Sequence, residues 1–297
     1  MGLPITDPVL RVQSQLTDRD HTLLGWLADH GVLTSFQIAH ALFPSTDYAQ
    51  DRLRKLAVLG VVDRFRPQKP DGGSYPYHYV LAQLGVEVVA AQRGEDPPRK
   101  DTARRRRWHL TNRANLPHKL GTNQFFIDLA GYARTHPDAE LRLWWPESAC
   151  RTVGPFMRPD APTVTHAFQP RIRPDGYALW VEHGVTVPMF VEYDTGTEKL
   201  GVLVDKLHGY HDLFAAIGRG WPVLFWLHSA DRERHLRSWL ADIRLGAIAV
   251  TGARDHATQA GLSPAEAVWT TVHGDGRRLR LVDLARLVVD RALAGAT

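Results

Sequence analysis

Three acidic residues lie on two successive strand-like segments, at positions where a sheet normally buries apolar side chains. Asp175 follows Pro174 near the start of the segment RPDGYALWVEHG, and Glu192 and Asp194 belong to the next one, VPMFVEYD. Side chains alternate along a strand, so Phe190, Glu192 and Asp194 are expected on one face. Ionised carboxylates are rarely buried without a partner or a metal. These residues are therefore the best candidates for chemistry.

A hairpin of the two segments would bring Asp175 close to Glu192. Two or three carboxylates that converge at a sheet edge suit a hard divalent cation such as Mg²⁺. Such a metal polarises a phosphodiester and supplies hydroxide. We therefore predict Asp175, Glu192 and Asp194 as metal ligands and catalytic residues.

Each of these acids also has a structural interpretation. Asp175 in Pro-Asp-Gly is typical of a turn. Glu192 and Asp194 can instead form ion pairs with basic side chains. The basic residues considered for these pairs are Arg171, Arg173 and Lys206. Both interpretations stay open at the level of the sequence.

The elements before this segment indicate a DNA-reading module. Helical patterns at 16–31, 36–43 and 45–60 are followed by two short strands around the turn KPDGG. Three helices and a hairpin in this order predict a winged helix-turn-helix whose third helix enters the major groove. Its polar face is expected to contact bases and phosphates. The predicted DNA-binding residues on it are Thr46, Tyr48, Gln50, Arg54 and Lys55. The alternative is a winged helix that contacts protein.

A basic cluster follows this module. The net charge is +4 and the pI about 9.3, and the excess is concentrated at 99–107. Such a cluster favours a polyanion, of which nucleic acid is the obvious one, although a solvated linker is the alternative. Its four consecutive members, predicted to contact the DNA backbone, are Arg104, Arg105, Arg106 and Arg107. The preceding helix LAQLGVEVVAAQRG packs either on a second subunit, giving a homodimer, or in its own domain.

Length and composition bound the protein class. The chain of 297 residues, 44% hydrophobic and 23% charged, is that of an ordinary globular protein with about two domains. The lone Cys150 excludes a disulfide framework and a Cys-rich zinc site. The sequence shows no signal peptide and no run of about 18 apolar residues, so we expect a cytoplasmic protein without a membrane span.

The second half predicts helix, strand, strand, strand, helix, strand, an αβββαβ core with a mixed sheet flanked by helices. We expect an α/β domain in a chain that is α+β overall. The predicted divisions are a flexible arm at 1–15, the winged helix-turn-helix at 16–94, a basic linker at 95–115, and a core at 116–297 that ends in a C-terminal helical extension.

This order resembles the PD-(D/E)XK nuclease, or restriction-endonuclease-like, fold over roughly 116–228. Pro174-Asp175 at the start of one strand and Glu192-Tyr193-Asp194 on the next carry the resemblance. In that family the aspartate and glutamate bind metal, and a lysine two residues after the glutamate assists the attacking water. Here Asp194 occupies the lysine position.

We expect a lysine of the following helix to supply the missing charge. Lys206, ahead of Lys199, is the expected substitute, and it lies one turn before Tyr210, so both are expected to face the sheet. Further candidates for completing the site are Asn123, Asp128 and Glu147.

The chain also resembles the actinobacterial replication-relaxation family over roughly residues 17–240. The motifs that carry this resemblance are Tyr79–Leu81, Leu116–His118, Arg173–Gly176 and Glu192–Glu198. The resemblance implies a role in plasmid or mobile-element replication or DNA relaxation. The partners it implies are double-stranded DNA and a replication protein or relaxase.

Two hypotheses follow. In the first, the protein binds DNA and nicks it with Mg²⁺, which the presence of Asp175 and Glu192 favours. In the second, it is a non-enzymatic transcription or replication regulator whose degenerate nuclease-like domain serves dimerisation or scaffolding. Asp194 at the lysine position favours the second.

Overall fold

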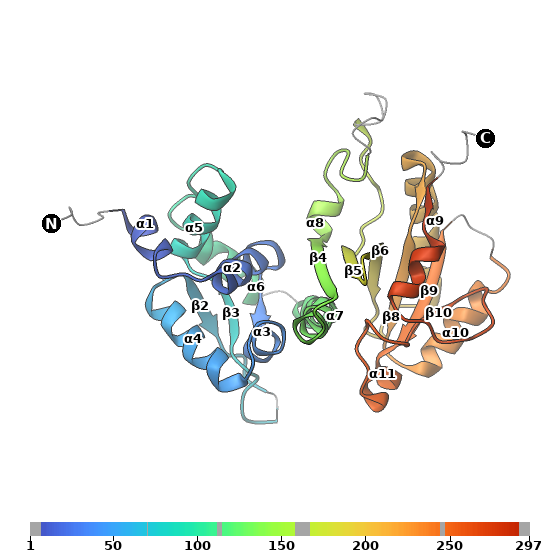
Figure 1. Cartoon of the computed structure of the whole chain (residues 1–297), viewed down its shortest axis with the longest axis horizontal. Helices are drawn as coiled ribbons and strands as arrows, with labels where there is room; N and C mark the ends of the chain where they lie inside the picture. The colour runs from blue at the N-terminus through green and yellow to red at the C-terminus, as the bar shows by residue number, and fades with distance from the viewer. Residues whose placement is uncertain (1–6, 70, 112–114, 158–166, 244–246, 291–297) are drawn as a thin grey trace. The chain divides into compact units, whose positions relative to one another are not determined.

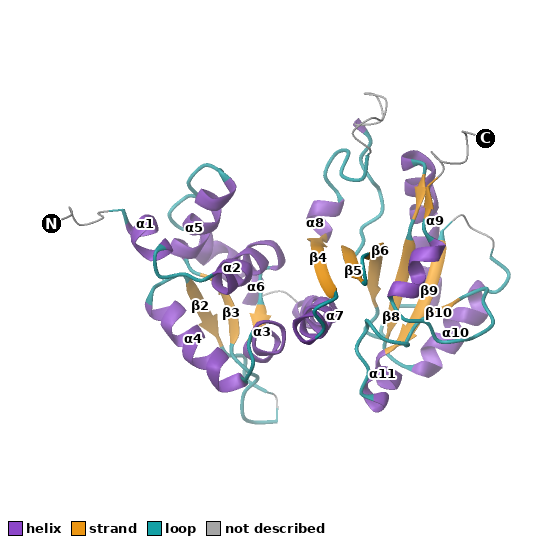
Figure 2. Cartoon of the chain, in the orientation of Figure 1, coloured by secondary structure: helices purple, strands orange, loops and turns teal. Residues whose placement is uncertain are grey.

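The computed structural model describes residues 7–69, 71–111, 115–157, 167–243 and 247–290. The chain divides into two units, Met1–Ile127 and Asp128–Thr297, which are described separately (Figures 1 and 2). None of the described helices is both long and apolar enough to cross a membrane.

Unit 1 consists of short helices around a small antiparallel sheet of order β1-β3-β2. Its elements are α1 (Pro8–Gln13), α2 (Asp18–His30), β1 (Leu33–Thr34), α3 (Ser35–Leu42), α4 (Thr46–Val58), β2 (Val62–Phe65), β3 (His78–Leu81), α5 (Gln83–Arg93) and α6 (Thr102–Thr111). Thr17, Thr34 and Ser45 cap α2, α3 and α4 by accepting a hydrogen bond from the backbone N–H three residues later.

Three parts of unit 1 differ from the predicted boundaries. Residues 8–13 of the predicted flexible arm form α1, whose Val12 is buried. Residues 102–111 of the predicted basic linker form α6, because Leu110 packs against Val32 and Val80. Helix α5 packs inside its own unit, against α2 and α1.

The division between the units falls inside α7 (Leu116–Thr135) rather than at 95–115. Two long-range hydrogen bonds hold the first half of α7 in unit 1. Gln37 Nε2 donates to the Leu120 carbonyl at 2.9 Å, and Asn123 Nδ2 donates to the Val32 carbonyl at 2.8 Å. Asn123 therefore has a structural role in unit 1, and the suggestion that it completes the acidic site is corrected.

Unit 2 is built on a six-stranded mixed sheet of order β10-β9-β8-β6-β5-β4, as predicted for the core. β4, β5 and β6 form an antiparallel meander, whereas β6, β8 and β9 run parallel. Its elements after α7 are β4 (Ala139–Pro146), α8 (Glu147–Cys150), β5 (Gly176–Glu182), β6 (Val185–Tyr193), α9 (Leu200–Ile217), β7 (Arg219–Gly220), β8 (Pro222–Leu227), α10 (Ala230–Leu240), β9 (Ile248–Ala253), α11 (Arg254–Ala260), β10 (Thr270–Thr271), the 3₁₀ helix η2 (Val282–Leu287) and β11 (Val289–Asp290).

The β5–β6 hairpin determines which acids meet. Its two-residue turn has positive φ at His183 (50°) and Gly184 (78°), as in the type I′ turns that match the twist of hairpin strands. The resulting register pairs Gly176 with Val191. Asp175 and Glu192, the next residues along each strand, are therefore neighbours, and a slip of one residue would turn Glu192 to the opposite face.

Helices α9 and α10 bury one face of this sheet through a shared apolar core. The chain end differs from the predicted C-terminal helix at 282–294. Only 282–287 is helical, as the 3₁₀ helix η2, and β11 then pairs with β7; residues 291–294 lie outside the described part. Arg278 pairs with buried Glu233, and Arg280 pairs with buried Glu182. These contacts attach the residues that precede η2 to α10 and to β5.

Candidate functional site

Glu192 is the centre of the acidic site in unit 2. Its side chain is 1% exposed on β6, and two residues of α9 reach it. Lys206 Nζ donates to Oε2 at 2.7 Å, and the Tyr210 hydroxyl donates to Oε1 at 2.5 Å. The donors are four residues apart and hence on one helix face, as the sequence indicated. The predicted alternative of an ion pair with Lys206 is confirmed for Glu192.

The electrostatics of this cluster follow from burial. Burial, reinforced by the charge of Asp175, raises the pKa of Glu192 to about 7, although Lys206 and Tyr210 stabilise the carboxylate. Burial lowers the pKa of Lys206, but Glu192 and Asp175 outweigh it, and the net direction is upward. Lys206 is therefore a fixed ammonium, whereas Glu192 exchanges its proton near neutral pH.

Cys150 is not available as a nucleophile. Its side chain is fully buried, and burial raises the pKa of the thiol to about 12. A neutral buried thiol is unreactive.

Asp175 immediately precedes β5 and is partly buried. Its Oδ2 accepts a hydrogen bond of 2.8 Å from the backbone N–H of Tyr193. This bond joins the start of β5 to the end of β6. Asp175 is also near enough to influence the pKa of Glu192 and of Lys206. Asp175, Glu192 and Lys206 are thus brought together.

Asp194 is directed elsewhere. Its buried carboxylate is held by the guanidinium of Arg232 on α10, with Nε donating to Oδ2 at 2.5 Å and a second N–H donating to Oδ1 at 2.8 Å. Arg232 also donates to the carbonyl of Glu198. This bidentate pair fastens the loop after β6 to α10. The sequence offered no signal for Arg232, which lies 38 residues away.

The predicted three-ligand metal site therefore does not assemble in this geometry. Among the described residues, no group of three or more histidine, cysteine, aspartate or glutamate side chains is arranged to hold a metal ion. Arg232 donates to both oxygens of Asp194, and Lys206 donates to Oε2 of Glu192. Metal binding by the remaining pair, Asp175 and Glu192, stays a prediction.

The second group of candidate residues lies on α4 in unit 1. Ala49, Leu53 and Leu56 are buried and form the inner face of this helix. The five predicted DNA-binding residues are all exposed on the remaining surface. They are Thr46, Tyr48, Gln50, Arg54 and Lys55. Arg52, which was not predicted, joins α4 to α2 through an ion pair with buried Asp20.

The β2–β3 hairpin adds basic residues that were not predicted. The guanidinium groups of Arg64 and Arg66 lie 4.3 Å and 5.0 Å from the ring centroid of Tyr77, and Lys69 lies 5.6 Å from that of Tyr75. Figure 1 shows α4 and the loop of this hairpin on the same side of unit 1. The alternation of Arg64 and Arg66 before the turn was the available sequence signal.

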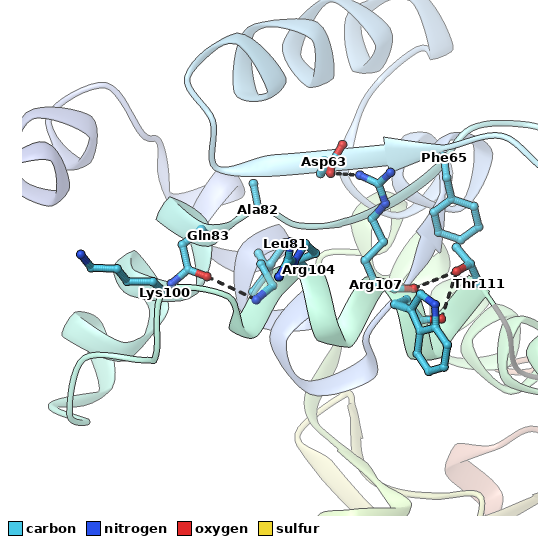
Figure 3. Close-up of a pocket in the computed structure, with 11 residues that line it drawn as sticks. Asp63, Phe65, Leu81, Ala82, Gln83, Lys100, Arg104, Arg107 and Thr111 are labelled. Carbon is cyan, nitrogen blue, oxygen red and sulfur yellow. Dashed lines mark hydrogen bonds and ion pairs between the residues drawn. The ribbon is translucent and has the colours of Figure 1, made fainter.

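The four arginines of α6 are in different environments. Arg105 pairs with Asp101, which immediately precedes the helix, and Arg107 pairs with Asp63 of β2. Arg104 and Arg106 are exposed and have no ion pair within the described residues. Arg104 and Arg107 also line a pocket next to β2 (Figure 3). The predicted backbone-binding cluster is thus spread around one helix.

A protein-family model matches this chain. The model of the family described as replication-relaxation matches residues 24–224, which is more than half of the chain. No curated protein and no solved structure matches the chain. The matched range includes α4, the basic hairpin, α6 and the Glu192 cluster. The chain therefore belongs to the replication-relaxation family.

Proposed function

We propose that the protein binds duplex DNA through a winged helix-turn-helix in unit 1, and that it acts in this way in replication or relaxation. Family membership indicates a role in the replication or relaxation of plasmid or other mobile DNA. The observation that carries DNA binding is the exposed polar and basic face of α4 next to a hairpin with three cationic side chains.

The chemistry of this surface suits a duplex. Thr46, Tyr48 and Gln50, in the first turns of α4, face base edges in the major groove. Arg54 and Lys55 follow them and contact phosphates. Arginines of the hairpin, stacked on tyrosine and so held in place, add contacts to the backbone beside the groove.

The test is duplex binding at several salt concentrations. Replacing both Arg54 and Lys55 by Ala should weaken binding and reduce the slope of log K against log salt by about 0.9 for each phosphate that the variant no longer neutralises. The matched control is Arg142→Ala with Arg234→Ala, which removes two exposed arginines of unit 2 that, like Arg54, form exposed ion pairs. Equal binding by both double variants would show that α4 is not the reader.

A second function, metal-dependent nicking of DNA, is favoured by one observation. The Lys206 ammonium lies 2.7 Å from Glu192 on the strand next to Asp175, so a lysine is present although Asp194 stands at the expected position. Asp175 and Glu192 would hold Mg²⁺, which polarises a phosphodiester when bound. The engagement of Asp194 by Arg232 favours the alternative, a regulator whose core serves as a scaffold.

Supercoiled plasmid distinguishes the two. A nickase converts it to the open circle with Mg²⁺ or Mn²⁺, and Asp175→Asn removes this activity while duplex binding is retained. Asp205→Asn, an exposed carboxylate next to Lys206 on α9, is the matched control and should nick as the wild type does. Absence of metal-dependent nicking in the wild type supports the scaffold. Equal nicking by the wild type and Asp175→Asn would assign the activity to a contaminant.

A further inference from the structure

A pocket of about 580 Å³ lies in unit 1 between the hairpin strands, the start of α5 and α6 (Figure 3). Its volume is within the range of small-molecule sites. Figure 3 shows Lys100 at one end of it and Phe65 and Thr111 at the other.

The walls of the pocket are apolar and aromatic. Phe65 and Leu81 come from the two hairpin strands, and Trp108 comes from α6. Trp108 is 62% exposed although large aromatic side chains usually bury most of their surface. The pocket therefore offers exposed indole surface to a planar ligand.

The rim of the pocket is cationic. Lys100, Arg104 and Arg107 line it together with the single carboxylate of Asp63, which pairs with Arg107. Lys100 and Arg104 have no ion pair in the part of the chain that the structure describes. Two positive charges are thus left for an anion beside an aromatic surface.

Hydrogen bonds and buried side chains of the protein hold the pocket in shape without a ligand. Gln83 Oε1 accepts a hydrogen bond from the Ala103 N–H at 3.3 Å, and Gln83 Nε2 donates to the Arg99 carbonyl at 3.1 Å. Ala103 and Leu110 are buried and anchor α6 from below. A preformed site loses little conformational entropy on binding.

We propose that this pocket binds an unpaired nucleotide, with its base stacked on Trp108 and its phosphate at Arg104, one helical turn away, while Lys100 adds positive charge at the other end of the pocket. Phosphates of a duplex need only the cations, and paired bases do not expose their faces. Aromatic side chains beside a basic groove are the features that bind single-stranded nucleic acid. The proposal deepens the proposed function and rests on it, because it places unpaired DNA in the unit that binds the duplex.

The test uses the full-length protein and the fluorescence anisotropy of a labelled single-stranded oligonucleotide. Trp108→Ala should lose about 5- to 150-fold in affinity, the range that loss of one stacked base produces. Trp108→Phe should restore most of it, and duplex binding by both variants should remain as in the wild type. The matched control is Trp239→Ala, which removes a similarly exposed tryptophan of unit 2. Unchanged single-strand affinity in Trp108→Ala would overturn the proposal.

The cationic rim has its own control. Lys100→Ala with Arg104→Ala should weaken single-strand binding far more than Arg11→Ala with Arg93→Ala, which removes the same charge from exposed positions of unit 1 outside the pocket. Equal losses in the two double variants would show diffuse attraction rather than a site, and would also overturn the proposal.

Competition by dAMP and by 2-deoxyribose 5-phosphate identifies the source of the nucleotide. Displacement of the oligonucleotide by dAMP alone supports a site for a free nucleotide. If neither compound displaces the oligonucleotide and its binding still depends on Trp108, the site takes a nucleotide that is part of a strand. Equal displacement by both would remove the role of the base and overturn the proposal. Failure of the proposed duplex-binding function gives a different result: replacing Arg54 and Lys55 would then leave duplex binding unchanged.

Discussion

The replacement Glu192→Gln tests the reasoning about the buried cluster most directly. It keeps the shape of the side chain and removes its titration. In the folded protein the pKa of Glu192 is about 7, because burial and the charge of Asp175 disfavour the carboxylate, against an ordinary value of 4.5. Between these two pH values the folded state therefore binds a proton that the unfolded state has released.

The sign and magnitude of the effect follow from this difference. A raised pKa contributes stability that is complete below about pH 4.5 and is lost as the pH rises through about 7. The difference between the two pKa values, at about 1.4 kcal/mol per pH unit, corresponds to about 3 kcal/mol. The free energy of unfolding of the wild type, relative to Glu192→Gln, should thus decrease by about this amount between pH 4.5 and pH 8.5.

Urea unfolding followed by tryptophan fluorescence measures this. Of the nine tryptophans only Trp26 and Trp108 lie in unit 1, so the signal reports mainly on unit 2. Glu198→Gln is the matched control, because Glu198 is also close to Lys206, at 3.6 Å, but is 43% exposed. It should stay within about 0.5 kcal/mol of the wild type. A difference between wild type and Glu192→Gln that is constant with pH, or that grows in favour of the wild type, would refute the reasoning.

Two other predictions concern stability. Gly85→Ala should destabilise unit 1 by more than about 2 kcal/mol, because the added Cβ would lie 1.9 Å from the Val61 carbonyl oxygen. Gly25→Ala, whose Cβ would have nothing within 4 Å, should instead stabilise unit 1 by about 0.5–1 kcal/mol. Thermal unfolding of both variants checks this, and a stabilised Gly85→Ala would contradict it. Asp194→Asn should lower the free energy of unfolding in urea by about 3 kcal/mol, because it leaves the charge of Arg232 without its buried partner. The double variant Asp194→Asn with Arg232→Met should recover most of this loss. A single variant as stable as the wild type would show that the pair is not needed.

Features that depend on neighbours in sequence were predictable. The caps of α2, α3 and α4 follow from a hydroxyl three residues before an unpaired N–H. The common face of Lys206 and Tyr210 follows from their spacing of four residues on a helix. The mixed sheet followed from alternating strand patterns joined by one crossover helix.

Features that depend on contacts across the chain were not. Residues 95–115 were expected to form a linker because they are polar and basic, but 102–111 form α6, which buried Ala103 and Leu110 attach to unit 1. The chain end was expected to be helical from its apolar spacing, yet pairing of β11 with β7 takes its backbone. Both outcomes are decided by tertiary partners that local periodicity does not reveal.

The sequence by itself determined that acids lie on adjacent strands, that a lysine follows on the next helix, and that a polar, basic helix precedes a hairpin. Only the tertiary structure decided the partner of each acid. The register of the β5–β6 hairpin places Asp175 beside Glu192. The packing of α10 brings Arg232 to Asp194, with which it forms an ion pair. The physical reason is that a buried charge takes the partner that packing brings within hydrogen-bond distance, and that distance depends on strand register and helix docking rather than on spacing in the chain.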